Sequence, residues 1–196
     1  MTLIITREMA NGSWSTTTGK ESSNSKGSLM RICLISTYPP EMCGIANYSM
    51  ELAKSLRHYV KVWIIANKVG SYKGVSNEGG IYVFRCWKKD DIFYPIHIAI
   101  ACIKSRADVI HVQDHYSLFG GPLSAILFPF LLLLLRFIVR KPVIVTLHSV
   151  IPRSHLEKTL FQKYGLGAKF TFIKRTLIIF IVKSIGLLAD ALIVHN

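Results

Sequence analysis

From position 30 onward, short apolar runs alternate with longer segments that have helical periodicity. The apolar runs, which we interpret as strands, are residues 31–36, 60–66, 81–86, 109–112, 143–147 and 191–195. The helical segments are residues 45–57, 91–105 and 156–188, the last with a break near residues 165–167. Short all-apolar strands that alternate with helices are typical of a parallel sheet covered on both faces. The pattern therefore predicts an α/β fold, a Rossmann-like doubly wound parallel sheet.

The segment before this pattern has a different composition. Residues 8–28 are rich in Ser, Thr, Gly and Asn and contain almost nothing to bury. Such segments cannot compensate the entropy lost on ordering. We therefore predict a disordered leader over residues 1–29 and one domain over residues 30–196, a length sufficient for one well-buried core.

Two further segments are apolar enough to raise the question of a membrane. In residues 123–139 the apolar stretch before Arg136 is 13 residues long and contains Pro129, whereas a transmembrane helix needs about 20 residues. A buried crossover helix, or one that dips into the interface, fits better than a span. In residues 170–188, Lys174, Arg175 and Lys183 would each cost about 2.5–3.5 kcal/mol at a bilayer centre. This segment is expected to lie on the membrane surface.

The charge balance agrees with an anionic partner. The formal net charge is +13, with 24 Lys and Arg against 11 Asp and Glu. Residues 141–196 hold eight basic and two acidic residues, and the basic ones stand beside Leu, Ile and Phe. This context favours an anionic membrane surface over nucleic acid, for which no recognition motif is present. The alternative is a solvated helix face on a basic protein.

The spacing of the four cysteines bears on the cellular compartment in which the protein works. Cys33, Cys43, Cys86 and Cys102 have no CxxC or other paired spacing, so we predict neither a zinc site nor a disulfide framework. Such cysteines suit a reducing environment. No signal-peptide pattern is visible in residues 1–29. We therefore expect a cytoplasmic protein, peripheral on the inner face of the membrane.

The candidate chemistry follows the predicted strands, because open α/β sheets bind ligands outside the carboxyl ends of their strands. Gly44 opens the first helix, where backbone N–H groups can approach an anion. His115 follows the fourth strand and is a ligand candidate, whereas His111, inside that strand, is expected to be a hydrogen-bonded core histidine. His148 follows the fifth strand and is the strongest candidate, able to hydrogen-bond a hydroxyl or a diphosphate oxygen. No G-x-S-x-G elbow is present, which excludes that form of Ser-His-Asp hydrolysis.

Four segments in the same order resemble landmarks of family 4 glycosyltransferases, which have the GT-B fold. They are RICLISTYPPEMCGIANYSMELAKSL, ADVIHVQDHYSLFGG, PVIVTLHSVIP and ADALIVHN, and together they extend from about Met30 to Asn196. The chain is thus similar to the N-terminal, acceptor-side half of a GT-B fold. The resemblance implies a retaining transferase that moves a sugar from a nucleotide-sugar to a lipid or saccharide acceptor.

The same resemblance assigns roles to residues. Gly44 would lie near the donor phosphate and the acceptor, His148 would contact the donor sugar as the catalytic-site residue, and Gln113 and His115 would line the acceptor side. The remaining candidate binding residues are Ile45, Thr146 and His195. The resemblance implies no metal ion and no cofactor, with the nucleotide-sugar acting as a co-substrate.

The resemblance also implies a second, donor-binding Rossmann domain with an acidic E-x7-E signature, which these residues lack. We therefore expect no transferase activity from this chain alone, and a partner chain or further domain that binds the donor. The alternative is a non-catalytic, membrane-associated scaffold that recruits a donor-binding subunit. A phosphate-binding module of unrelated function would carry G-x-G-x-x-G after the first strand, and this motif is not present.

Overall fold

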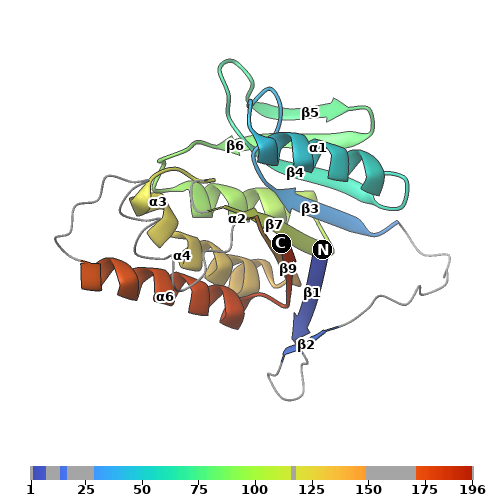
Figure 1. Cartoon of the computed structure of the whole chain (residues 1–196). Helices are drawn as coiled ribbons and strands as arrows, with labels where there is room; N and C mark the ends of the chain where they lie inside the picture. The colour runs from blue at the N-terminus through green and yellow to red at the C-terminus, as the bar shows by residue number, and fades with distance from the viewer. Residues whose placement is uncertain (1, 8–13, 17–28, 116–117, 149–170, 196) are drawn as a thin grey trace.

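The computed structural model describes residues 2–7, 14–16, 29–115, 118–148 and 171–195. They form a sheet with the strand order β2-β1-β9-β8-β7-β3-β4-β6-β5 (Figure 1). Six neighbouring strands of this sheet run parallel. They are β9 (Ala191–His195), β8 (Val143–Leu147), β7 (Val109–Asp114), β3 (Arg31–Ile35), β4 (Lys61–Asn67) and β6 (Ile81–Trp87). The prediction of an α/β fold with a mostly parallel sheet is confirmed, and the arrangement is compatible with a Rossmann-like fold.

The strand order reverses between β3 and β7. The chain runs outward from β3 through β4 to β6 and then returns to the other side of β3 for β7, β8 and β9. At such a reversal the connections leave neighbouring strands in opposite directions and open a crevice at the carboxyl edge of the sheet. The fold therefore places a crevice beside the ends of β3 and β7.

Helices flank the sheet in two groups (Figure 1). One side carries α1 (Gly44–Leu56). The other carries α2 (Tyr94–Ser105), α3 (Pro122–Ile126), α4 (Phe128–Leu133), the π-helical turn η1 (Leu134–Val139) and α6 (Thr171–Leu188). The part of segment 156–188 predicted as helix that the structure describes is α6, while residues 156–170 lie outside the described residues.

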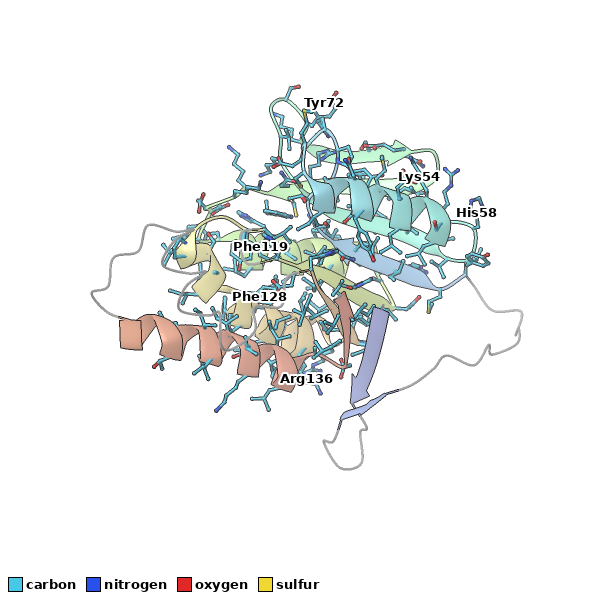
Figure 2. The ribbon with its side chains drawn as sticks, in the orientation of Figure 1. Lys54, His58, Tyr72, Phe119, Phe128 and Arg136 are labelled. Atoms are coloured by element: carbon cyan, nitrogen blue, oxygen red, sulfur yellow. The ribbon has the colours of Figure 1, made fainter. Side chains whose placement is uncertain are left out.

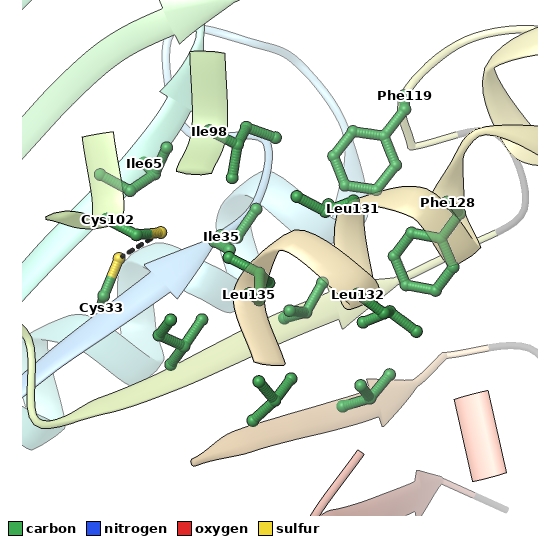
Figure 3. Packing of buried hydrophobic residues seen from close by; sticks show 14 of the residues in the cluster. Cys33, Ile35, Ile65, Ile98, Cys102, Phe119, Phe128, Leu131, Leu132 and Leu135 are labelled. Atoms are coloured by element: carbon green, nitrogen blue, oxygen red, sulfur yellow. Dashed lines mark hydrogen bonds between the residues drawn. The ribbon is translucent and has the colours of Figure 1, made fainter. Parts of the chain in front are cut away.

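Each group of helices covers its own hydrophobic core. On β3, Cys33 and Ile35 belong to the core under α2 and α4, whereas Ile32 and Leu34 belong to the core under α1. Since both faces are buried, the strand is apolar from Ile32 to Ile35 rather than alternating. Figure 3 shows the larger core, in which helix residues such as Leu131 meet the inner strands.

Phe119 ties the loop after β7 into this core. Its ring stacks on Tyr94 at 4.5 Å between centroids and contacts Trp87 at 5.1 Å and Phe128 at 5.8 Å. Such aromatic pairs each add about 0.5–1.5 kcal/mol beyond the area that they bury. The loop that follows the strand end is thus fixed by packing as well as by its backbone.

Two features of the fold were not predicted. An edge strand, β5 (Gly74–Glu78), pairs antiparallel with β6 through a turn at Gly79 and Gly80, whose φ angles are 60° and 90°. The crossover expected as one helix over residues 123–139 is divided into α3, α4 and η1, with Pro129 in the first turn of α4. Proline fits a first turn because no hydrogen bond is lost there.

Part of the expected leader is ordered in the sheet. Strand β1 (Thr2–Arg7) pairs antiparallel with β9, and β2 (Trp14–Thr16) pairs with β1. The prediction of a disordered leader is therefore wrong for these two segments, which extend the sheet beyond β9. Residues 8–13 and 17–28 lie outside the described residues.

Candidate functional site

A pocket of about 400 Å³ lies at the carboxyl edge of the parallel sheet. Five segments contribute to it: the loop after β3, the start of α1, and the residues that follow β6, β7 and β8. The lining residues are Thr37, Cys43, Gly44, Ile45, Lys89, His115, Leu118 and His148. This volume is within the usual range for small-molecule sites, about 300–1,000 Å³. Four residues predicted from the sequence, Gly44, Ile45, His115 and His148, thus come together around one pocket.

The N-terminal end of α1 forms one wall of the pocket. Cys43 caps the helix weakly, with its Sγ accepting from the backbone N–H of Ala46 at 3.4 Å and contacting Thr37 Oγ1 at 3.2 Å. The first turn carries no acidic side chain to neutralise the positive helix end. A Cβ added at Gly44 would meet nothing within 4 Å. A ligand can therefore approach this helix end closely, and an anion is the ligand that it favours.

A network of side chains holds the backbone of the loop between β3 and α1 in place. The buried Arg85 guanidinium donates to the carbonyl oxygen of Pro39 and, at 3.4 Å, to that of Asn67. Glu41 accepts from Asn67 Nδ2 at 3.0 Å and pairs with Lys89 Nζ at 2.5 Å. The Lys89 hydrogen bond holds the pKa of Glu41 below its ordinary value. Lys89 thus places a positive charge at the pocket, and Glu41 balances that charge.

His148 is held on three sides. Its backbone N–H donates to the carbonyl oxygen of Asp114 at 3.0 Å. Its ring Nε2 lies 2.6 Å from Gln113 Oε1, and Tyr48 of α1 contacts the ring edge-on with centroids 4.9 Å apart. The ring is therefore anchored by both β7 and α1 while it lines the pocket.

Gln113 and Thr146 lie behind the pocket wall rather than on it. Both are fully buried. His111, also buried, lies 2.7 Å from Thr146 Oγ1 and 3.4 Å from Gln113 Nε2, measured from its Nε2. The prediction that His111 is a hydrogen-bonded core histidine is confirmed. Direct contact of Gln113 or Thr146 with a ligand stays a prediction, and the structure gives them contacts with histidines instead.

His195 lies at the carboxyl end of β9, the strand next to β8. Its backbone is therefore at the same edge of the sheet as His148, in register with Thr2 of β1. Its binding role stays a prediction.

Burial shifts two titratable groups on β7. Desolvation, helped by the neighbouring His148, lowers the pKa of His111 to about 4, so that this ring is neutral at pH 7. Desolvation raises the pKa of Asp114 to about 7. Desolvation favours the neutral form of both groups on β7, so it lowers the pKa of the histidine and raises the pKa of the carboxyl group.

Several lining residues were not predicted, namely Thr37, Cys43, Lys89 and Leu118. Lys89 follows the end of β6 by two residues, and the rule that ligands bind beyond strand ends applies to it as well. Among the described residues, no group of three or more His, Cys, Asp or Glu side chains is placed to hold a metal ion.

No family model, curated protein or solved structure matches this chain. The family resemblance of the four segments therefore remains an inference from their residues.

Proposed function

We propose that this chain is the acceptor-side domain of a retaining glycosyltransferase that transfers a sugar from a nucleotide-sugar to a lipid or saccharide acceptor. In this proposal the sheet is the doubly wound N-terminal half of a GT-B fold. One observation carries the proposal: Gly44, His115 and His148, from three segments that resemble family landmarks, line one pocket. His195, from the fourth segment, ends the strand next to β8.

The pocket offers the two kinds of group that a sugar diphosphate requires. The weakly capped positive end of α1 and the Lys89 ammonium suit phosphate oxygens. The imidazoles of His115 and His148 suit hydroxyl groups. In the proposed enzyme, transfer requires a donor-binding domain facing this pocket, because holding both reactants in position can lower a barrier by roughly 7–11 kcal/mol.

Binding of the sugar end of a nucleotide-sugar tests this proposal. We expect saturation-transfer NMR with a panel of nucleotide-sugars at millimolar concentration to label sugar protons more strongly than base protons. His148→Ala should weaken this binding about 5- to 10-fold, which corresponds to one lost hydrogen bond of about 1 kcal/mol.

The matched control is Lys54→Ala. Lys54 is on α1 but pairs with Glu51 on the exposed side of the helix, so its removal should leave the NMR signals unchanged. The proposal is wrong if no nucleotide-sugar is labelled, or if His148→Ala binds as well as the unchanged protein.

We propose in addition that the α4, η1 and α6 layer lies on an anionic membrane surface. Large apolar side chains are exposed along this layer, among them Phe130, Phe137, Ile138, Phe180, Val182 and Leu187. Arg140, Lys141 and Lys183 are exposed within or directly after these helical segments, and residues 122–141 and 171–188 contain no acidic residue. By length and composition the helical stretch 122–139 could also cross a membrane, although a third of it is buried in the protein.

Vesicle flotation tests this orientation. The protein should float with vesicles that contain anionic lipid at low salt and lose this binding at high salt. Lys183→Glu should weaken binding at least 5-fold, since each basic residue near such a surface contributes about 1 kcal/mol. Lys54→Glu, which lies on the opposite side of the molecule from Arg136 (Figure 2), should have little effect.

Absence of flotation at low salt would contradict the membrane proposal. Flotation without any nucleotide-sugar binding would instead favour the alternative of a membrane-associated scaffold that recruits a separate subunit. The two measurements together therefore distinguish an enzyme domain from a scaffold.

A further inference from the structure

A row of four polar side chains leads from the pocket into the buried sheet. It begins at His148, which lines the pocket, and continues through Gln113 and His111 to Thr146. The last three are buried. Gln113 and His111 are two residues apart on β7, so they share a face, and Thr146 stands opposite Gln113 on β8. The row is therefore built by the register between two parallel strands.

The donors and acceptors in this row are mutually consistent. Gln113 turns its Nε2, which can only donate, toward His111 Nε2, so that this nitrogen must accept and carries no proton. The Thr146 hydroxyl then donates to the same nitrogen at 2.7 Å. Gln113 Oε1, which can only accept, faces His148 Nε2 at 2.6 Å, so that His148 must donate from Nε2.

We propose that Gln113 is a positioning residue that holds His148 in the tautomer protonated at Nε2, and that His111 and Thr146 fix the orientation of the Gln113 amide. The catalytic meaning of this arrangement rests on the proposed function, but the tautomer itself does not. With Nε2 committed to Gln113, the neutral His148 ring can accept a hydrogen bond only at Nδ1.

Burial makes the arrangement rigid. An unsatisfied polar group in a buried site costs about 1–3 kcal/mol. Reversing the Gln113 amide alone would set two donors against each other at His148 and two acceptors against each other at His111. Moving the His148 proton from Nε2 to Nδ1 alone would set two acceptors against each other. Burial also keeps His111 neutral, since it lowers the pKa of this ring to about 4. A neutral His111 is the state that can accept from both Gln113 and Thr146.

This arrangement has a consequence for the ligand. A fixed Nε2–H makes the neutral His148 an acceptor toward a donor group such as a sugar hydroxyl. The ring can donate to a phosphate oxygen only if it takes up a second proton or if its hydrogen bond to Gln113 breaks. Gln113 thereby affects which ligand group His148 recognises, although Gln113 itself is fully buried.

Nitrogen-15 NMR of the histidine rings tests the proposal on the ligand-free protein. We expect the shifts of His148 to report a proton on Nε2 and those of His111 a proton on Nδ1. Gln113→Leu should convert His148 to a mixture of tautomers. Ser105→Ala, which removes another buried hydrogen bond on α2, should leave both rings unchanged.

A second variant, Gln113→Glu, tests the proposal if Gln113→Leu does not fold. In Gln113→Glu the carboxylate can still accept from His148 and adds a negative charge, so the midpoint of the His148 titration should move to higher pH. A proton on Nδ1 of His148 in the unchanged protein overturns the proposal. So does a titration midpoint that does not move in Gln113→Glu.

Ligand binding separates this proposal from the proposed function. If Gln113 acts through His148, the double variant Gln113→Leu/His148→Ala should bind nucleotide-sugar no more weakly than His148→Ala alone. An additional loss in the double variant would assign Gln113 a contact of its own and overturn its role as a positioning residue. If no nucleotide-sugar binds at all, the proposed function fails, while the NMR result still decides the tautomer.

Discussion

Replacing Gly120 with alanine is expected to lower the free energy of unfolding by about 3–5 kcal/mol. Gly120 has φ +127°, a conformation that residues with a side chain rarely adopt. A Cβ at this position would lie 2.2 Å from Asp90 Oδ1 and 2.6 Å from the Asp90 backbone nitrogen. The side chain can rotate away, but the backbone contact can be relieved only by moving the loop.

The neighbouring Gly121 supplies the control. Its φ is −75°, and its added Cβ would meet Asp90 Oδ1 at 3.4 Å, an ordinary contact. Urea unfolding should therefore show a large loss for Gly120→Ala and a change of less than about 1 kcal/mol for Gly121→Ala. Equal stabilities of the two variants would mean that the loops after β6 and β7 are not in contact as described.

This contact matters for the pocket as well as for stability. Asp90 donates its backbone N–H to Phe119 and accepts from the N–H of Gly121 through its carboxylate at 2.6 Å. The loop after β7 is thereby fastened to the loop after β6, and these loops bring His115 and Lys89 to the same pocket. Ligand binding should decline together with stability in Gly120→Ala.

The sequence was sufficient for the parallel strands because most of their residues are apolar, and inner strands such as β3 are buried on both faces. Strand β5 escaped prediction because its residues, GVSNE, are polar and exposed at the sheet edge. A usable signal existed in Gly79 and Gly80, since a pair of glycines between two extended segments is typical of a tight hairpin. Strand β1 precedes residue 30, where the alternation of apolar runs and helical segments begins. It pairs with β9, a strand far away along the chain.

The pocket could be predicted in part because one rule of α/β sheets, that ligands bind beyond the carboxyl strand ends, needs only strand positions. That rule found Gly44, His115 and His148. The same rule applies to Lys89, which follows the third predicted strand. The buried row behind His148 was beyond such a rule, because the pairing of Gln113 with Thr146 depends on strand register.

Two desolvated titratable groups on β7 should give opposite pH dependences of stability. The pKa of Asp114 is raised to about 7 in the folded protein, so between pH 4 and 7 the folded state keeps a proton that the unfolded state has lost. Its contribution to stability is full below pH 4 and is lost as the pH rises toward 7. The pKa of His111 is lowered to about 4, so its contribution is full above pH 6.5 and is lost as the pH falls toward 4.

Single variants should separate these opposing contributions. In Asp114→Asn only the histidine effect remains, and stability relative to the unchanged protein should fall by on the order of 3 kcal/mol between pH 7 and pH 4. In His111→Gln only the carboxyl effect remains, and the relative stability should rise by a similar amount over the same interval. Urea unfolding at several pH values measures both slopes.

The slopes are more informative than the stabilities themselves. His111→Gln also removes an acceptor from the buried row, which lowers stability at every pH, but a constant loss does not alter a slope. Comparison with the unchanged protein cancels the titration of all other groups, because they are common to both proteins. If both variants ran parallel to the unchanged protein, Asp114 and His111 would be hydrated in the folded state. The neutral His111 on which the tautomer of His148 depends would then lose its physical basis.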